Sequence, residues 1–213
     1  MKKLNTEELK TLCTELRSFL ITNISHTGGH LAANLGMVEI TVALLRSFDF
    51  PADKIVFDVG HQSYIYKILT GRRDRFGTLR KKGGLCGFPR PTESSYDCFA
   101  TGHSSTSISA ALGLSTSMRL SGDKHFSVAV IGDGAFTGGL AYEGLNNAGR
   151  YGKQMMVILN DNEHSINKNV GAMPKYLSRL TSRPKYFKVK DDTKRIIKKL
   201  PVVGDHLYKL IHR

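Results

Sequence analysis

Residues 128–162 read VAVIGDGAFTGGLAYEGLNNAGRYGKQMMVILNDN, and this stretch decides the fold. Two aliphatic runs, at residues 128–131 and 155–159, have the composition and length of buried parallel strands. Apolar residues between them recur near helical spacing, at Leu140, Leu145 and Ala148. The unit is therefore predicted to be a strand, a turn, a helix and a second strand, joined by a right-handed crossover. This arrangement predicts an α/β protein in which helices flank a parallel sheet.

Polar residues follow both predicted strands. Gly132, Asp133 and Gly134 come directly after the first strand, and the sequence Asn160-Asp161-Asn162 ends the second. Ligands of open parallel sheets bind beyond the carboxyl ends of the strands, so Asp133 and Asn162 are expected to lie close together. A carboxylate and an amide oxygen suit Mg²⁺, which keeps coordination places for water and phosphate. The two glycines let the backbone approach a ligand, and the next helix begins there and attracts anions.

The sheet end is therefore predicted to bind a diphosphate that is bridged by a metal ion. The tripeptide Gly-Asp-Gly is by itself more often a simple turn. The strand before it and the Asn-Asp-Asn strand end after it favour the ligand site.

The same residues resemble the thiamine-diphosphate signature of the transketolase superfamily. Four blocks resemble 1-deoxy-D-xylulose-5-phosphate synthases in order and spacing, and the resemblance covers residues 9–173. The blocks are HTGGHLAANLGMVEIT (26–41), FDVGHQSYIYKILTGRRDRFGTLRKKGGL (57–85), ATGHSSTSISAALG (100–113) and VILNDNEHSI (157–166).

The resemblance implies a role for each matching residue. Mg²⁺ would be held by Asp133, Asn162 and the backbone carbonyl of His164. Thiamine diphosphate would be bound by His61, Gly102, His103, Ser104, Gly134, Ala135 and Asn162. The two catalytic residues would be His30 and His61, with His30 assisting proton transfer at the reacting carbon. Histidine suits that task because its pKa lies near working pH. One departure from the family is Tyr66, which stands where a histidine is frequent.

The implied reaction converts pyruvate and D-glyceraldehyde 3-phosphate into 1-deoxy-D-xylulose 5-phosphate and CO₂, for isoprenoid and thiamine synthesis. Chains of the family are much longer and carry the activating glutamate in a second domain. This chain is expected to be the diphosphate-binding part, incomplete at its C-terminal side and inactive without a pyrimidine-domain chain or homodimer partner. Two alternatives remain open. One is the amino-terminal subunit of a split transketolase, and the other is a catalytically silent fragment that binds magnesium diphosphate or other subunits.

Composition narrows the class of protein. A hydrophobic fraction of 40% and a charged fraction of 23% are typical of a globular protein. Neither a membrane-length apolar run nor a secretory signal is present, and the three cysteines lack metal-ligand spacing, so a cytoplasmic enzyme is expected. The net charge of +13 is concentrated in residues 175–213, which alone carry +9 (12 Lys or Arg, 3 Asp or Glu). No nucleic-acid motif accompanies this charge, so neither nucleic acid nor membrane is an expected partner.

The domain prediction places the diphosphate-binding domain at residues 1–174 and a basic extension, a loop and then a short helix, at 175–213. Helices are predicted at residues 6–22, 35–48, 63–69 and 106–117, and strands at 54–59 and 126–131. The first helix is expected to begin with an Asn5–Glu8 capping pair, to bury Cys13 and to pack on the sheet. The small residues of the fourth helix predict close packing, with a partner chain as one candidate for the packing surface. The basic run at residues 72–82 is interpreted as a solvated loop, with a phosphate or dimer contact as the alternative.

Overall fold

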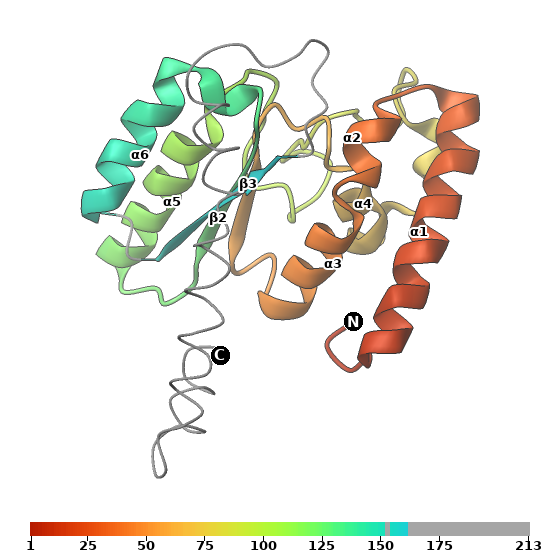
Figure 1. The fold of residues 1–213 in the computed structure, drawn as a ribbon, viewed down its shortest axis with the longest axis horizontal. Helices are drawn as coiled ribbons and strands as arrows, with labels where there is room; N and C mark the ends of the chain where they lie inside the picture. Colours follow the sequence, from red (N-terminus) through yellow and green to blue (C-terminus); the bar gives the residue numbers. More distant parts are fainter. Residues whose placement is uncertain (152–153, 162–213) are drawn as a thin grey trace, which may run out of the picture. The chain divides into compact units, whose positions relative to one another are not determined.

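The computed structural model describes residues 1–151 and 154–161, and these contain a three-stranded parallel sheet (Figure 1). The strands are β1 (Lys54–Phe57), β2 (Ser127–Gly132) and β3 (Met155–Asn160), in the order β1-β2-β3. Lys54 pairs with Ser127, and Ser127 pairs with Met155, so β2 lies between the other two. The predicted parallel sheet is confirmed, and both aliphatic runs of the 128–162 stretch form strands.

The helices precede, separate and cover these strands. They are α1 (Thr6–Thr27), α2 (Leu31–Leu35), α3 (Val38–Ser47), α4 (Tyr64–Lys67), α5 (Ser107–Ser121) and α6 (Gly139–Tyr151). A π-helical turn at Ile68–Arg72 and two 3₁₀ turns, Phe76–Thr78 and Ala135–Thr137, complete the described elements. No helix in these residues is long and apolar enough to cross a bilayer.

Each face of the sheet has its own cover. On one face, Phe57 and Val130 pack with Met37 and Leu44, from the start of α3 and its body, and with Tyr66. Side chains alternate along a strand, so every second residue of β1 and β2 points to the opposite face of the sheet. Helix α5 covers that face. There the Ser127 hydroxyl donates a hydrogen bond to the Ala111 carbonyl at 2.8 Å. Helix α6 lies beside α5 on the same side of the sheet (Figure 1).

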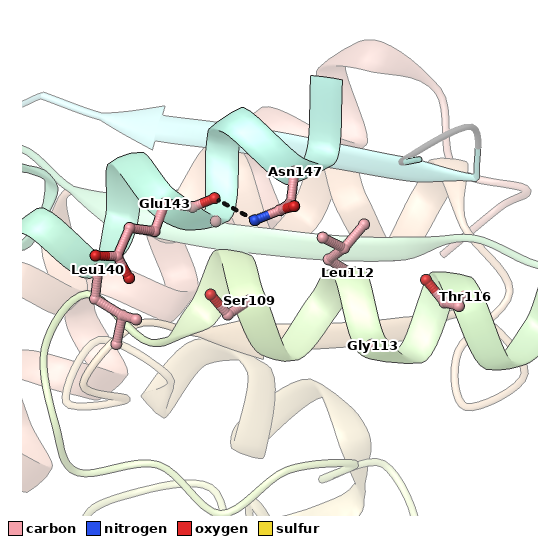
Figure 2. A pocket seen from close by; sticks show the side chains of 8 residues that line it. Ser109, Leu112, Gly113, Thr116, Leu140, Glu143 and Asn147 are labelled. Atoms are coloured by element: carbon pink, nitrogen blue, oxygen red, sulfur yellow. Dashed lines mark hydrogen bonds between the residues drawn. The ribbon is translucent and has the colours of Figure 1, made fainter. Parts of the chain in front are cut away.

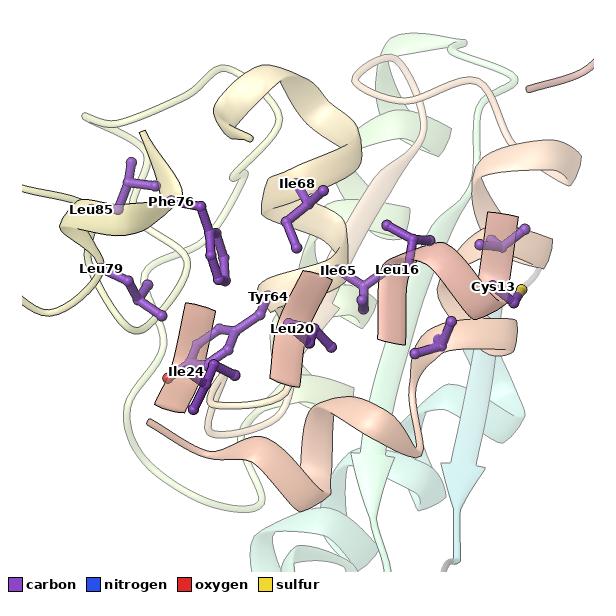
Figure 3. Packing of buried hydrophobic residues seen from close by; sticks show 12 residues of the cluster. Cys13, Leu16, Leu20, Ile24, Tyr64, Ile65, Ile68, Phe76, Leu79 and Leu85 are labelled. Atoms are coloured by element: carbon purple, nitrogen blue, oxygen red, sulfur yellow. The ribbon is translucent and has the colours of Figure 1, made fainter. Parts of the chain in front are cut away.

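Helix α1 packs away from the sheet, so the prediction that it covers the sheet is wrong. Its buried residues Leu16, Leu20 and Ile24 contact Tyr64 and Phe76, as Figure 3 shows. The reason is that α3 already occupies this face of the sheet, and α1 therefore packs on α3 and on residues 64–85. The predicted burial of Cys13 on this helix is confirmed, since the residue is 6% exposed.

The start of α1 is confirmed, but its end is not. Asn5 accepts a hydrogen bond from the Glu8 N–H at 3.0 Å, and Glu8 accepts one from the Asn5 N–H at 2.7 Å. The helix continues five residues beyond the predicted end and stops at Gly28, whose φ of 71° lies in the left-handed region. The predicted end was too early because residues 22–27 are mostly polar, although the buried Ile24 continues the apolar stripe of Leu16 and Leu20.

Glycines set most of the other boundaries. The helix predicted at residues 35–48 corresponds to α3, which begins three residues later and ends one residue earlier. The short α2 before it was not predicted, and Gly36 and Met37 separate the two helices. The stop predicted at Gly71 is confirmed, since this residue has a φ of 89°. Helix α5 extends to Ser121 and ends at Gly122, with a φ of 74°. The predicted extension at residues 175–213 lies outside the described residues, so the domain division stays a prediction.

Candidate functional site

The carboxyl ends of the three strands meet at one edge of the sheet, and predicted site residues follow each strand. His61 lies four residues after β1, and Asp133 comes directly after β2. The Asp133 N–H donates to the Asn160 carbonyl at 3.3 Å, so the half-buried Asp133 lies beside the Asn160-Asp161 end of β3. The other two predicted metal ligands, Asn162 and His164, lie outside the described residues. The metal site as a whole therefore stays a prediction.

The two predicted catalytic histidines lie side by side. The ring centroids of His30 and His61 are 5.2 Å apart, with the planes inclined at 66°. His30 is exposed and also approaches Phe88, with 6.5 Å between the centroids, whereas His61 is half-buried. The loop before α2 and the loop after β1 thus present two imidazoles at the same end of the sheet.

Sequence reasoning missed Asn34, which holds these two loops together. Its side chain is fully buried. The amide nitrogen donates to the His30 carbonyl at 2.7 Å and to the His61 carbonyl at 2.8 Å, and the amide oxygen accepts from the Tyr64 N–H at 2.8 Å. An amide can donate and accept in this way, whereas an aliphatic side chain cannot. Asn34 directly precedes the helix predicted at residues 35–48, and no pattern in the sequence marks it as an anchor.

Tyr64 contacts the His30 ring through its hydroxyl. Its side chain is fully buried, and its hydroxyl lies 3.5 Å from Nδ1 of His30. Burial raises the pKa of the Tyr64 hydroxyl, so this group keeps its proton at neutral pH. The contact gives His30 a fixed neutral neighbour on one ring nitrogen.

His61 is held in its neutral form. Burial lowers its pKa, the nearby charge of His30 lowers it further, and Asp58 opposes the shift only in part. Its Nδ1 atom is buried and has no hydrogen-bond partner within the described part of the chain. A neutral imidazole can donate or accept one proton near working pH, which suits acid–base chemistry.

We expect His61 to titrate below the ordinary histidine value of about 6.5 when followed by NMR of its ring protons. Because the folded pKa is the lower one, the unfolded chain takes up the proton first as the pH falls. Stability is thus complete above the unfolded pKa and decreases as the pH falls toward the folded pKa. In the His30→Ala variant the His61 midpoint should move upward. A midpoint at or above the ordinary value in the unsubstituted protein would contradict this prediction.

A second set of predicted residues is gathered by Ser105. Gly102, His103 and Ser104 are exposed and come directly before it. The Ser105 hydroxyl donates to the Ala135 carbonyl at 2.7 Å, which ties this segment to the predicted Gly134-Ala135 turn. Five predicted cofactor positions therefore lie on two segments that this hydrogen bond joins: Gly102, His103, Ser104, Gly134 and Ala135. Asp58, which anchors Ser105, was not predicted from the sequence.

The backbone is closely packed at Gly60, the residue before His61. Gly60 has a φ of 93°, and a Cβ atom there would lie 2.1 Å from the Thr101 hydroxyl and 2.6 Å from Pro89. Only glycine therefore fits at this position. The Thr101 hydroxyl is buried and, like His61 Nδ1, meets no hydrogen-bond partner among the residues that the structure describes.

Two other features of the sequence, Tyr66 and the basic run at residues 72–82, lie outside the candidate site. Tyr66 is buried, and its hydroxyl donates to the Tyr96 carbonyl at 3.0 Å. In the basic run, the solvated-loop interpretation is wrong for Arg72, which is 4% exposed and paired with Asp97, because two buried carboxylates face it. The same interpretation is confirmed for Arg73 and Arg75, which are exposed.

A groove between α5 and α6 contains none of the predicted site residues. Figure 2 shows small and polar side chains along it, among them Ser109, Thr116 and Asn147. A Cβ atom on Gly144 of α6 would lie 2.9 Å from the Ser109 hydroxyl, so the small residues of α5 do permit close packing. The packing partner here is α6 of the same chain.

Comparison with known proteins gives a family, many relatives and a fold. The family model described as 1-deoxy-D-xylulose-5-phosphate synthase matches residues 1–213. Synthases of Natranaerobius thermophilus and Clostridium kluyveri are 57% and 53% identical to all 213 residues, which make up 34% of each relative. Transketolase from Leishmania mexicana is similar in structure, with a TM-score of 0.66 and 19% identity over 80% of this chain and 30% of that one. The chain thus spans about a third of its curated relatives.

Proposed function

Since the chain belongs to the 1-deoxy-D-xylulose-5-phosphate synthase family, we propose that it forms the part of such a synthase that binds thiamine diphosphate and Mg²⁺. Enzymes of this family depend on both cofactors. The observation that carries the proposal is the meeting of Asp133 with the end of β3, beside the segment that Ser105 ties to Ala135. A carboxylate and backbone N–H groups at one sheet end are what a magnesium diphosphate requires.

The residues present fit the cofactor. The buried Nδ1 atom of His61 and the buried Thr101 hydroxyl meet no partner in residues 1–151 and 154–161, so polar atoms remain for a ligand at this edge. When bound, thiamine diphosphate supplies the carbanion chemistry, while the protein positions and polarises the reactants. We assign Asp133 to the metal, together with Asn162 and the His164 carbonyl. The diphosphate is assigned to Gly134 and Ala135, and the cofactor wall to His61, Gly102, His103 and Ser104.

The histidine pair supplies proton transfer in this proposal. His30 is exposed at the sheet edge, where it can reach a substrate, and His61 is the neutral, half-buried member. The two rings lie edge to face with 5.2 Å between their centroids, so both acid–base groups are present at the same place. The proposed substrates are pyruvate and D-glyceraldehyde 3-phosphate.

Turnover is proposed to require a pyrimidine-domain chain or a homodimer partner, because the cofactor's ring needs a carboxylate that no residue here is assigned to supply. A cytoplasmic location is proposed as well, and it is supported by the free thiols of Cys13, Cys86 and Cys98. The alternative of a split transketolase is less well supported, since the transketolase structures share 17–20% of residues and speak for the fold alone.

The Asp133→Ala substitution tests the proposal. We expect it to weaken magnesium-dependent binding of thiamine diphosphate at least about tenfold in calorimetry, because a charge-assisted contact is lost. Asp123→Ala is the matched control, since this partly exposed aspartate lies at the amino end of β2 and contacts His125. Equal affinity of the Asp133→Ala variant and the unsubstituted protein would remove the metal assignment. Product analysis with pyruvate against a ketose phosphate donor separates a synthase from a transketolase.

A further inference from the structure

Asp58 is a buried carboxylate that joins β1 to the segment before α5. The residue is 1% exposed. One carboxylate oxygen accepts the Ser105 N–H at 2.7 Å, and the other accepts the Ser107 N–H at 2.9 Å. Its own N–H donates to the Val130 carbonyl of β2 at 2.7 Å, and its carbonyl accepts from the Gln62 side chain at 2.9 Å. All four polar atoms of Asp58 therefore have partners, and the carboxylate is fixed relative to the sheet.

The bond from Ser105 holds a backbone that a serine rarely adopts. Ser105 has a φ of 68°, in the left-handed region, and is 6% exposed. Such a conformation persists only where the surroundings hold it in place. The two N–H groups on either side of Thr106 both point at Asp58, and this arrangement holds the turn.

The side chain of Ser105 also contacts the turn after β2. Its hydroxyl donates to the Ala135 carbonyl at 2.7 Å, and a Cβ atom on Gly138 would lie 2.2 Å from that hydroxyl oxygen. Gly138 therefore lies directly against the Ser105 side chain, and a larger residue there would displace it. Asp58, Ser105 and Ala135 thus form a continuous link from the end of β1 to the end of β2.

We propose that Asp58 is a positioning residue for diphosphate binding. It acts through Ser105, and it sets the Gly102–Ser104 segment and the Gly134-Ala135 turn so that both meet the diphosphate together. Its carboxylate is not a ligand, because both oxygens already accept N–H groups and a diphosphate would be repelled by the negative charge. The inference rests on the proposed function, since it assumes that these two segments bind the cofactor.

The test measures the affinity of the full chain, and of the holoenzyme containing it, for two probes. These are thiamine diphosphate with Mg²⁺ and inorganic pyrophosphate with Mg²⁺. The Asp58→Asn variant keeps the size of the side chain but turns one acceptor into a donor that faces an N–H group. We expect both affinities to fall by about 10- to 100-fold, the usual effect of losing a group that orients ligand-binding residues. In the ligand-free protein, the Ser105 and Ser107 amides should exchange with solvent faster.

Asp53→Asn is the matched control. Asp53 is 7% exposed and also accepts two backbone N–H groups, those of Asp49 and Phe126, but it does so at the amino end of β1. Its substitution should lower the melting temperature to a similar extent while leaving both affinities unchanged. A fall in affinity that is equal in the two variants would return Asp58 to a purely structural role and overturn the inference.

A second variant decides the question if Asp58→Asn does not fold. Ser105→Ala keeps the N–H bond to Asp58 and removes only the contact with Ala135, and about a tenfold loss of affinity is expected. Normal affinity in Ser105→Ala, or in a folded Asp58→Asn, would overturn the inference alone. An unsubstituted protein that binds neither probe would overturn the proposed function, and the inference with it.

Discussion

Alanine in place of His30 or of His61 is expected to reduce the turnover of the complete enzyme by about 10²–10⁴-fold, the range for loss of a general acid or base. The melting temperature should change little, because His30 is exposed and the path of both loops is fixed by Asn34 through backbone carbonyls. Steady-state kinetics and thermal unfolding of the same preparations measure the two effects.

His26→Ala is the matched control for these variants. His26 is exposed in the last turn of α1, four positions before His30, and it belongs to none of the predicted sites. Its substitution should change neither rate nor stability. If His30→Ala or His61→Ala instead unfolded easily and kept normal specific activity, the histidine would have a structural role and not a catalytic one.

Arg72→Leu is expected to destabilise the protein by about 3–5 kcal/mol, the usual cost of leaving a buried charge without its partner. The Arg72 guanidinium donates to both oxygens of Asp97, at 2.6 and 3.0 Å, and to Glu93 at 3.2 Å. The Asp97 side chain is fully buried, and Lys67 at 3.8 Å is its more distant cation. Equilibrium unfolding in denaturant measures the loss, and Arg75→Leu, an exposed site in the same run, should lose less than about 0.5 kcal/mol.

The same cluster predicts a dependence on pH. Burial alone would raise the pKa of Glu93, but hydrogen bonds from Lys67 and from the Cys86 N–H outweigh it, and the pKa is lowered. A carboxylate with a lowered folded pKa stabilises the protein above its unfolded pKa, and this contribution is lost as the pH falls through the folded value. Lys67→Met should therefore flatten the acid side of the stability profile more than Arg72→Leu does, because Arg72 lowers the pKa of Glu93 least. Equal flattening in the two variants would contradict this prediction.

The sheet could be predicted from the sequence because its signals are local. The aliphatic runs of β2 and β3 and the glycine at position 71 act through their immediate neighbours, and each was confirmed. The resemblance to the family added the histidine pair, which no local pattern joins. Asp133 does lie at the carboxyl end of β2, as predicted, while the positions of Asn162 and His164 stay predictions.

The anchors of the site could not be predicted in the same way. Asn34 and Asp58 bind backbone groups 27 to 49 positions away in the chain. Every residue has a backbone carbonyl, and nearly every residue has an N–H group, so the sequence does not show which of them a distant side chain binds. The prediction that α1 packs on the sheet was wrong for a related reason. An apolar stripe indicates that a helix packs against something, but it does not indicate which surface. The sequence does not distinguish Arg72 from the exposed cations around it, because its partners Glu93 and Asp97 lie more than 20 positions later in the chain.

Asn34 separates the shape of the site from its chemistry. The amide binds the backbone carbonyl groups of His30 and His61, so these two hydrogen bonds do not depend on which side chains the loops carry. Substitutions at these two positions can change the reactive groups while the scaffold keeps its form. The fold can thus vary its reactivity in evolution, or in the laboratory, without first being rebuilt.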